Sequence, residues 1–364
     1  MRYIKCDLPE YPVVSDMWDT LARESRPIVV YGMGNGADKL IDRFEKYNIT
    51  VSDFFASDGF VRGHSFHGMR VKSFSEIKAT YPDFVIVLSF ASNRPEVIEM
   101  LEGIDSEYDM YVPDMPVTGE YYFDREFYNT NYDRIRMAHS LLADEESKNA
   151  FASIINYKLT GKMHYLMDTW STKDELYNEL SAREVRTYID AGAYNGDTAK
   201  EAIQYFPHLE RIVAIEPDPK NYKKLIKYSE NTTSHRIEPI NAAVWHEGGA
   251  GEFSSSGNRN SSIASTTSYE HKDTGVSLIS IDSLGLSPDY IKYDVEGAEL
   301  EALVGSHETV ERSHPTLLVS LYHRSRDIFE LPIYLAERYP FYKMTLRRLK
   351  CLPAWEIDLL LFAT

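Results

Sequence analysis

The sequence is poor in cysteine, in positive charge and in long apolar runs. Only two cysteines, Cys6 and Cys351, occur in 364 residues, which is too few for a disulfide framework or a cysteine-based zinc site. Lysine and arginine number 39 against 56 aspartates and glutamates, so the formal net charge is −17. An acidic surface repels phosphate groups, and we therefore expect no nucleic-acid partner.

No run approaches the roughly 18 apolar residues of a membrane span, and residues 1–12 lack the apolar segment of a signal peptide. We therefore expect a cytoplasmic protein without a membrane span. A hydrophobic fraction of 43% is enough for a full core, and a length of 364 residues predicts two domains. The sequence leaves the oligomeric state open.

What the sequence does contain is a strand–loop–helix–strand unit at residues 188–218. Its first apolar run ends at Asp190, a glycine turn follows at 192–196, a helix begins at 197–198, and a second apolar run ends at Glu216. Glycines let the backbone approach a ligand closely, and the helix amino terminus offers unpaired N–H groups. Glu216 stands about 20 residues past the turn, where an acid binds both hydroxyls of a ribose.

Two features of this unit differ from an ordinary dinucleotide site. Asp190, placed before the first glycine, would repel a pyrophosphate and attract a cation, and the glycine spacing is looser than G-x-G-x-x-G. An adenosine ligand with a cationic tail, S-adenosylmethionine, fits both features better than the alternative of a generic turn with incidental acids.

A later strand adds to the expected adenine site. The small side chains where residues 237–244 end suit a flat adenine ring, which Asn241 would hydrogen-bond, although a buried strand end explains them equally. The predicted cofactor-binding residues are Asp190, Gly192, Ala193, Tyr194, Asn195, Gly196, Asp197, Thr198, Glu216, Pro217, Asn241, Ala242, Ala243 and Asp294.

The pattern of strands and helices predicts an α/β fold in three parts. From residue 181 onward strands alternate with helices, which indicates a parallel sheet covered on both faces. We expect a seven-stranded Rossmann-like domain at 181–364 that ends in an antiparallel hairpin, preceded by a small Rossmann-like α/β domain at 1–117 and a helical connector at 118–180. Aromatic side chains of the connector are expected in the core rather than stacked on carbohydrate. The Ser/Gly/Asn-rich stretch 254–268 is predicted to be a loop.

The amino-terminal domain carries a second glycine pattern. The run from Gly32 through Gly34 and Gly36 to Ala37 fits G-x-G-x-x-A between a predicted strand and helix, with Asp58 downstream. One interpretation is a nucleotide or nucleotide-sugar pocket. We favour the other, in which the glycines only allow close strand–helix packing, because the domain lacks a second nucleotide-binding half.

Six segments between residues 186 and 323 resemble the FkbM family of S-adenosylmethionine-dependent methyltransferases. In chain order they are YIDAGAYNGDT, VAIEPDP, NAAV, ISIDSL, IKYDVEGAELEALVGS and HPTLLVSLYH. The resemblance implies the class I methyltransferase fold and, often, O-methylation of a hydroxyl on a sugar, glycan or natural product. Tyr194 stands where family members often carry asparagine, and residues 1–117 lie outside the resemblance.

Three residues at strand ends are the candidates for catalysis: His323, Asp294 and Glu296. His323 is the preferred base, because an imidazole is partly neutral near pH 7; the alternative is a hydrogen-bonded structural histidine. Asp294 would contact substrate or cofactor, or else cap the following helix. Glu296 would sit in that helix's first turn, where the dipole alone favours an acid.

A divalent metal on these three residues is an option that we do not favour, because strand-end carboxylates also occur in enzymes without metal. The alternative function is a nucleotide- or nucleotide-sugar-binding protein that uses its amino-terminal domain, with the methyltransferase half serving as a binding module. The missing second half of that domain, and its lack of a Tyr-x-x-x-Lys pair, argue against an oxidoreductase.

Overall fold

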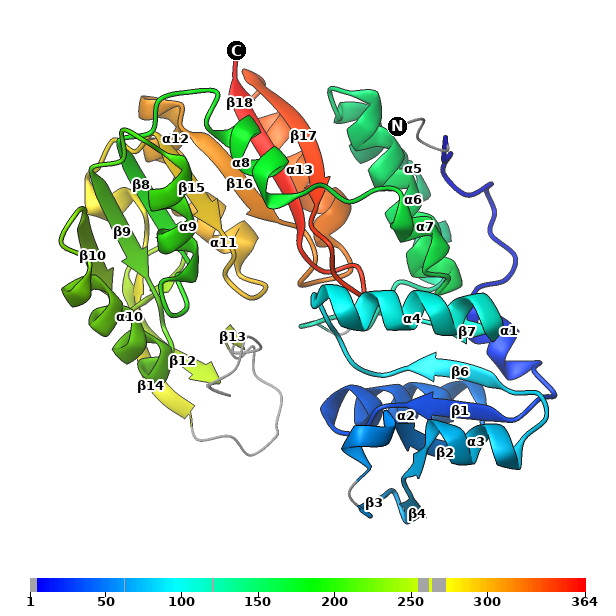
Figure 1. Ribbon diagram of the computed structural model, residues 1–364. Coiled ribbons are helices and arrows are strands. Elements are labelled where there is room, and N and C mark those ends of the chain that lie inside the picture. Colours follow the sequence, from blue (N-terminus) through cyan, green and yellow to red (C-terminus); the bar gives the residue numbers. More distant parts are fainter. Residues whose placement is uncertain (1–4, 62, 120, 255–261, 264–272) are drawn as a thin grey trace.

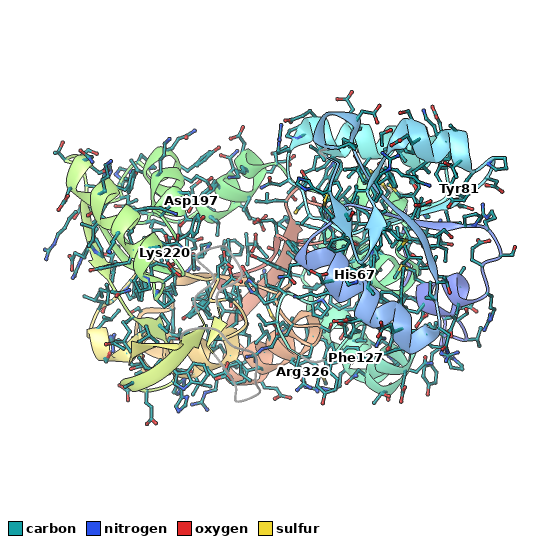
Figure 2. The ribbon with its side chains drawn as sticks, turned by 90° about the horizontal axis from the view of Figure 1, so that it is seen from below. His67, Tyr81, Phe127, Asp197, Lys220 and Arg326 are labelled. Atoms are coloured by element: carbon teal, nitrogen blue, oxygen red, sulfur yellow. The ribbon has the colours of Figure 1, made fainter. Side chains whose placement is uncertain are left out.

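The computed structural model describes residues 5–61, 63–119, 121–254, 262–263 and 273–364. The chain has an α/β fold with two lobes, each built on a mainly parallel sheet, and with helices between them (Figure 1). Viewed from below, Asp197 and Lys220 lie in one lobe, while His67 and Tyr81 lie in the other (Figure 2). None of the helices in the described ranges is long and apolar enough to cross a bilayer.

The amino-terminal lobe contains a parallel five-stranded sheet with the order β5-β2-β1-β6-β7. Its central strands are short apolar runs buried along their whole length, as expected for strands covered on both faces. The strands are β1 (Ile28–Tyr31), β2 (Val51–Ala56), β5 (Lys72–Ser73), β6 (Val85–Leu88) and β7 (Met110–Tyr111), and a small separate hairpin joins β3 (Ser65–Phe66) to β4 (Met69–Arg70). The helices are α1 (Met17–Ala22), α2 (Asn35–Tyr47), α3 (Phe74–Thr80) and α4 (Pro95–Glu107).

Helices between the lobes form a shared core. They are α5 (Arg125–Leu141), α6 (Glu145–Thr160), α7 (His164–Met167) and α8 (Lys173–Leu180). Asp124 and Asp144 cap α5 and α6 by accepting main-chain N–H groups. One hydrophobic cluster runs from the first sheet through α5 and α6 to the second sheet and includes Tyr128, Phe151 and Tyr157 with no exposed surface. These aromatic side chains are core residues, as expected.

The carboxyl-terminal lobe contains a seven-stranded sheet with the order β10-β9-β8-β15-β16-β18-β17. Only β18 runs antiparallel to its neighbours, so the carboxyl ends of β8, β9, β15 and β16 meet at one edge. The strands are β8 (Thr187–Ala191), β9 (Arg211–Ile215), β10 (Arg236–Ile240), β15 (Tyr290–Tyr293), β16 (Thr316–Ser320), β17 (Tyr342–Arg348) and β18 (Ile357–Ala363). The helices are α9 (Asp197–Tyr205), α10 (Pro219–Asn231), α11 (Glu299–Val304), α12 (His307–Ser313) and α13 (Asp327–Arg338).

The predicted strand at 237–244 divides into two. Its first part is β10, and its second part, β11 (Ala243–Val244), joins β12 (Gly249–Ser254), β13 (Ser262–Ile263) and β14 (Asp273–Ile279) in a separate four-stranded sheet. The chain turns between them at Asn241, whose side chain bonds to the end of β9. Most of the predicted loop 254–268 lies outside the described residues. The predicted domain boundaries, near 117 and 180, fall between secondary-structure elements and stay a prediction.

Candidate functional site

A cavity of about 460 Å³ opens at the carboxyl ends of β8, β9 and β15. The predicted cofactor residues that line it are Gly192, Tyr194, Asp197, Thr198, Glu216, Pro217, Ala242, Ala243 and Asp294, and Glu296 lines it as well. The predicted residues that do not line it are Asp190, Ala193, Asn195, Gly196, Asn241 and His323. The structure therefore brings most of the predicted site together and places the remainder behind it.

The glycine turn is tied to both neighbouring strands. The N–H groups of Gly192 and Ala193 both donate to the carbonyl oxygen of Ile215 at 3.0 Å, and Asp294 N–H donates to Ala191 at 3.0 Å. Gly192 has φ +91°, and a Cβ atom there would lie 1.8 Å from the carbonyl oxygen of Asp294. Only glycine allows this approach, so the turn holds the ends of β8 and β15 in register.

The rest of the turn is structural. Gly196 precedes α9, and a Cβ atom there would lie 2.6 Å from Cδ1 of Tyr228 on α10. Ala193 is fully buried. These residues set the shape of the loop and do not face the cavity.

Asp190 lies behind the cavity wall. It has no exposed surface and its Oδ2 accepts the hydroxyl of Thr198, which does line the cavity. Burial raises the pKa of Asp190 above its usual value. The positive charge of Lys292, which pairs with Asp190 across the sheet, offsets part of this rise. Asp190 thus reaches the cavity only through its hydrogen bond with Thr198, which differs from the direct contact with a cation that we expected.

Glu216 is held in place at the end of β9. Its two carboxylate oxygens accept main-chain N–H groups from Tyr194 and Asp218, each at 2.9 Å, and burial raises its pKa to about 7. Asn241 supports the same strand end by donating to the carbonyl oxygens of Glu216 and Pro217 at 2.8 and 3.1 Å. Its amide N–H groups are therefore used by the backbone, which differs from the adenine contact predicted for it.

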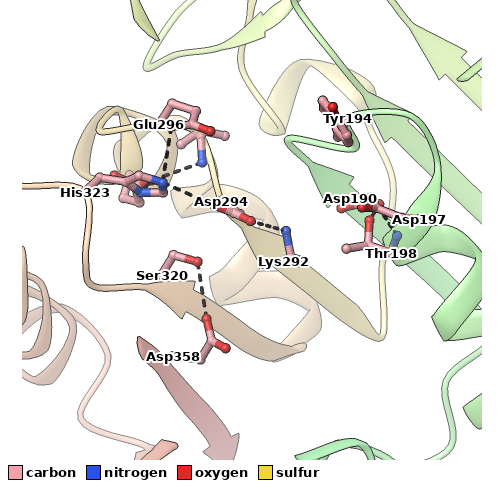
Figure 3. Close-up of polar contacts among 12 residues, drawn as sticks. Asp190, Tyr194, Asp197, Thr198, Lys292, Asp294, Glu296, Ser320, His323 and Asp358 are labelled. Atoms are coloured by element: carbon pink, nitrogen blue, oxygen red, sulfur yellow. Dashed lines mark hydrogen bonds and ion pairs between the residues drawn. The ribbon is translucent and has the colours of Figure 1, made fainter. Parts of the chain in front are cut away.

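Asp294, directly after β15, lies between Lys292 and His323 (Figure 3). It accepts Nζ of Lys292 at 2.8 Å and the hydroxyl of Tyr322 at 3.2 Å. Burial alone would raise the pKa of Asp294, but the charges of Lys292 and His323 lower it to about 2. Asp294 does not cap α11, whose N-cap residue, Ala298, makes no side-chain hydrogen bond.

His323 corrects our expectation of a partly neutral base. The side chain has no exposed surface, and its Nδ1 lies 2.9 Å from Glu299 Oε1. Its Nε2 lies 3.4 Å from Asp294 and 3.5 Å from Glu296 (Figure 3). Burial alone would lower the pKa of His323, but these three carboxylates, Glu299 foremost, raise it to about 10. The imidazolium is therefore charged at neutral pH and cannot accept a proton.

Glu296 lines the cavity between these groups. Glu296 has φ 55° and lies three residues before α11 begins. It is therefore outside the first turn of that helix, where we expected it. The pKa of Glu296 is raised to about 8, mainly by burial. The positive charge of His323 opposes this shift, and the negative charge of Asp294 adds to it. Among the described residues, none donates a hydrogen bond to its Oε2. This oxygen is buried 3.5 Å from Nε2 of His323, and the residue borders the cavity. A carboxylate with a raised pKa at a cavity wall can accept a proton when it is ionised.

Sequence reasoning missed several polar residues of this site. Lys292, Tyr322 and Asp358 line the cavity beside the predicted residues. A lysine inside the apolar strand YIKY was the available signal, because lysine is rarely buried unless it is paired. Within the described residues, no group of His, Cys, Asp or Glu is arranged to hold a metal ion.

In the amino-terminal lobe, Gly36 borders a smaller cavity of about 200 Å³, whereas Gly32 and Gly34 do not line it. A Cβ atom on Gly36 would lie 2.0 Å from the carbonyl oxygen of Ser89, and one on Gly32 would lie 2.6 Å from its Oγ, whereas Gly34 has open space around it. The close contacts of Gly32 and Gly36 agree with the packing interpretation. A nucleotide or nucleotide-sugar at this loop stays a prediction.

Comparison with known proteins agrees with the site. Residues 190–342 match the sequence model of the methyltransferase FkbM domain, and no curated protein sequence matches the chain significantly. The crystal structure of methyltransferase FkbM from Methylobacillus flagellatus KT is similar, with 18% identity, a TM-score of 0.68, and coverage of 97% of this chain and 94% of that one.

A second similar structure is precorrin-6y C5,15-methyltransferase from Geobacter metallireducens GS-15, with 12% identity, a TM-score of 0.32, and coverage of 52% of this chain and 86% of that one. The FkbM domain match covers the glycine turn, Glu216 and the Asp294–Glu296 loop, which contribute to the cavity, and His323, which lies behind it. The sequence match identifies residues 190–342 of the carboxyl-terminal lobe as a methyltransferase FkbM domain.

Proposed function

We propose that the chain is an S-adenosylmethionine-dependent O-methyltransferase that acts on a hydroxyl of a sugar, glycan or natural product. The observation that carries the proposal is a single cavity that joins the glycine turn and Glu216 to the Asp294–Glu296 loop. The sheet order β10-β9-β8-β15-β16-β18-β17 supports a Rossmann-like class I methyltransferase domain, preceded by a smaller α/β domain.

The cavity residues fit the cofactor chemically. Small side chains at Ala242 and Ala243 leave room for a flat base, and the Glu216 carboxylate can accept ribose hydroxyls. The amino terminus of α9, with Asp197 and Thr198, offers polar groups to an amino-acid tail. S-adenosylmethionine, when bound, supplies a methyl group activated by a positive sulfur. The surplus of acids around the cavity favours such a cation.

Glu296 is the residue we propose as proton acceptor. A sugar hydroxyl is a weak acid, so a base must take its proton as the oxygen becomes methylated. Asp294 is too weak a base at a pKa of about 2, and His323 already carries its proton. Glu296 has a pKa of about 8. In its ionised form it is therefore a stronger base than Asp294, and unlike His323 it has a site for a further proton.

Binding of the cofactor tests the proposal directly. Calorimetry with S-adenosylmethionine and S-adenosylhomocysteine should give binding to the full chain, and a ligand at about 100 times its dissociation constant should raise stability by about 2.7 kcal/mol. If neither compound binds or raises the melting temperature, the proposed function is wrong.

A further inference from the structure

The cavity extends beyond the residues expected to hold the cofactor. The cofactor residues belong to β8, β9 and the β10–β11 turn, on one side of β15 in the sheet, whereas Asp358 belongs to β18 on the other side. At that end the wall also contains Asn93 from the β6–α4 loop, Trp170 from the α7–α8 segment and Lys350 from the β17–β18 connection. Asn93, Trp170, Lys350 and Asp358 all lie outside the residues that match the FkbM domain.

Main-chain hydrogen bonds hold these three segments together. Ser92 and Leu352 exchange N–H···O bonds of 2.7 and 2.9 Å, and Ser171 N–H donates to Arg348 at 2.8 Å. The amino-terminal lobe and the helical connector are therefore docked on the hairpin that flanks the methyltransferase sheet. This end of the cavity is a preformed wall made by parts of the chain that are distant in sequence.

Trp170 is fixed within this wall. The guanidinium of Arg348, which has no exposed surface, lies 5.3 Å from the Trp170 ring centroid and donates to the carbonyl oxygen of Leu166 at 2.5 Å. The Lys350 ammonium lies 4.1 Å from the same centroid. An indole in a fixed position provides an apolar surface on which the C–H face of a polyhydroxyl ring can pack. The polar side chains beside it can form hydrogen bonds with the hydroxyl groups of that ring.

The charges around the cavity disfavour an anionic guest. Of the described residues that line it, seven are acids and three are lysines. Each lysine already has an acidic partner: Lys173 pairs with Glu201, Lys292 Nζ lies 2.8 Å from Asp294, and Lys350 Nζ lies 3.9 Å from Glu102. A phosphate or carboxylate on the guest would therefore meet no lysine without an acidic partner among the described lining residues, whereas a neutral hydroxyl can donate to a carboxyl oxygen.

We propose that Asn93, Trp170 and Lys350 form the acceptor-binding end of the cavity, and that it takes an uncharged polyhydroxyl ring rather than a phosphorylated or nucleotide-linked one. This inference rests on the proposed methyltransferase function. It gives the amino-terminal lobe a role in acceptor selection through the loop that carries Asn93. Asp358, which lies next to Ser320 at the end of β16, is placed to accept a hydroxyl of the ring.

The test is transfer of labelled methyl from S-adenosylmethionine by the full chain to matched acceptors. The probes are neutral glucose, N-acetylglucosamine and their oligosaccharides, each compared with the corresponding sugar phosphate or uridine-diphosphate sugar. We expect labelled product from neutral members and little or none from their anionic partners. Binding of S-adenosylmethionine measured on the same protein reports the proposed function separately. Cofactor binding without transfer to any neutral member, or with preferred transfer to an anionic one, would overturn the inference and leave the cofactor assignment standing.

Variants of the wall sharpen the test. Trp170→Ala and Asn93→Ala should each raise KM for the neutral acceptor about tenfold, with kcat and the S-adenosylmethionine Kd unchanged, and Trp170→Phe should recover part of the loss. Asn93 is exposed on a loop, so its variant should fold even if the Trp170 variant does not. Lys343→Ala, an exposed lysine of β17 outside the cavity, is the matched control. An acceptor KM that is unchanged in Asn93→Ala and Trp170→Phe would contradict the assignment.

Discussion

Nζ of Lys292, in β15, donates at 2.8 Å to Oδ2 of Asp294, which begins the loop after that strand, and both side chains are largely buried. This pair keeps Asp294 ionised at a pKa of about 2, in spite of its burial. A carboxylate so stabilised provides a fixed negative charge but is a poor proton acceptor. The same loop carries Glu296, whose pKa burial raises to about 8. Two neighbouring acids thus have opposite shifts in pKa, and this difference is the reason for proposing Glu296 rather than Asp294 as the base.

Replacing Glu296 by Gln should lower kcat by roughly 10²–10³, because general-base catalysis contributes about that much, while S-adenosylhomocysteine binding changes little. Steady-state kinetics with an accepted neutral sugar, together with calorimetry, measures both. Glu308→Gln, an exposed acid at the start of α12, should behave as wild type. A Glu296→Gln enzyme with full kcat would remove Glu296 from the mechanism.

The pH dependence of kcat/KM should follow the free enzyme's base. Because ionised Glu296 is the active form and its pKa is about 8, kcat/KM should rise as pH increases towards 8 and then level off. His323, with a pKa of about 10, stays charged through this range. Initial rates between pH 6 and 9.5 test this. A wild-type profile that is flat from pH 6 to 9 would contradict it.

Replacing Glu216 by Ala should weaken S-adenosylmethionine and S-adenosylhomocysteine about equally, by 10- to 100-fold as a rough estimate for a lost charge-assisted hydrogen bond. The two ligands share the ribose that Glu216 is proposed to bind. Titration calorimetry of the variant and of Glu230→Ala, an exposed acid on α10, provides the comparison. A variant that loses affinity for only one of the two compounds would place Glu216 elsewhere.

Replacing Gly192 by Ala should destabilise the protein by roughly 3 kcal/mol, because both the positive φ and the crowded Cβ are costly. The added carbon would lie 1.8 Å from the carbonyl oxygen of Asp294. Gly103→Ala, in α4 with no atom near its Cβ position, should instead stabilise by about 0.5–1 kcal/mol. Urea unfolding of both variants measures the difference, and equal stabilities would show that the turn is not close-packed.

Asp358 should make stability depend on pH. Burial, with the nearby charges of Glu356 and Asp294, raises its pKa from 3.8 to about 8. An acid whose pKa is higher in the folded state than in the unfolded state destabilises the folded protein when the pH is above the unfolded-state pKa. This free-energy cost grows as the pH rises and becomes constant once the pH exceeds the folded-state pKa. Asp358→Asn should therefore be more stable than wild type, with an advantage that increases between pH 5 and 8 by up to about 1.4 kcal/mol per pH unit.

Thermal melts at several pH values measure this difference, with Asp168→Asn, an exposed acid, as the control. An advantage for Asp358→Asn that stayed constant from pH 5 to 8 would mean that Asp358 is ionised in the folded protein throughout.

The sequence by itself determined the β8–α9–β9 unit, the glycine turn and the place of Glu216, because strand and helix periodicity and glycine's conformational freedom are local properties. The split after β10 was not predictable, because it depends on the bond from Asn241 to a different strand. Only the tertiary structure showed that His323 is surrounded by acids, because Glu299, Glu296 and Asp294 converge on it from another part of the chain. It also brought Asn93 and Trp170 to the cavity. A pKa and a cavity wall depend on distances between residues far apart in the chain, and folding alone sets those distances.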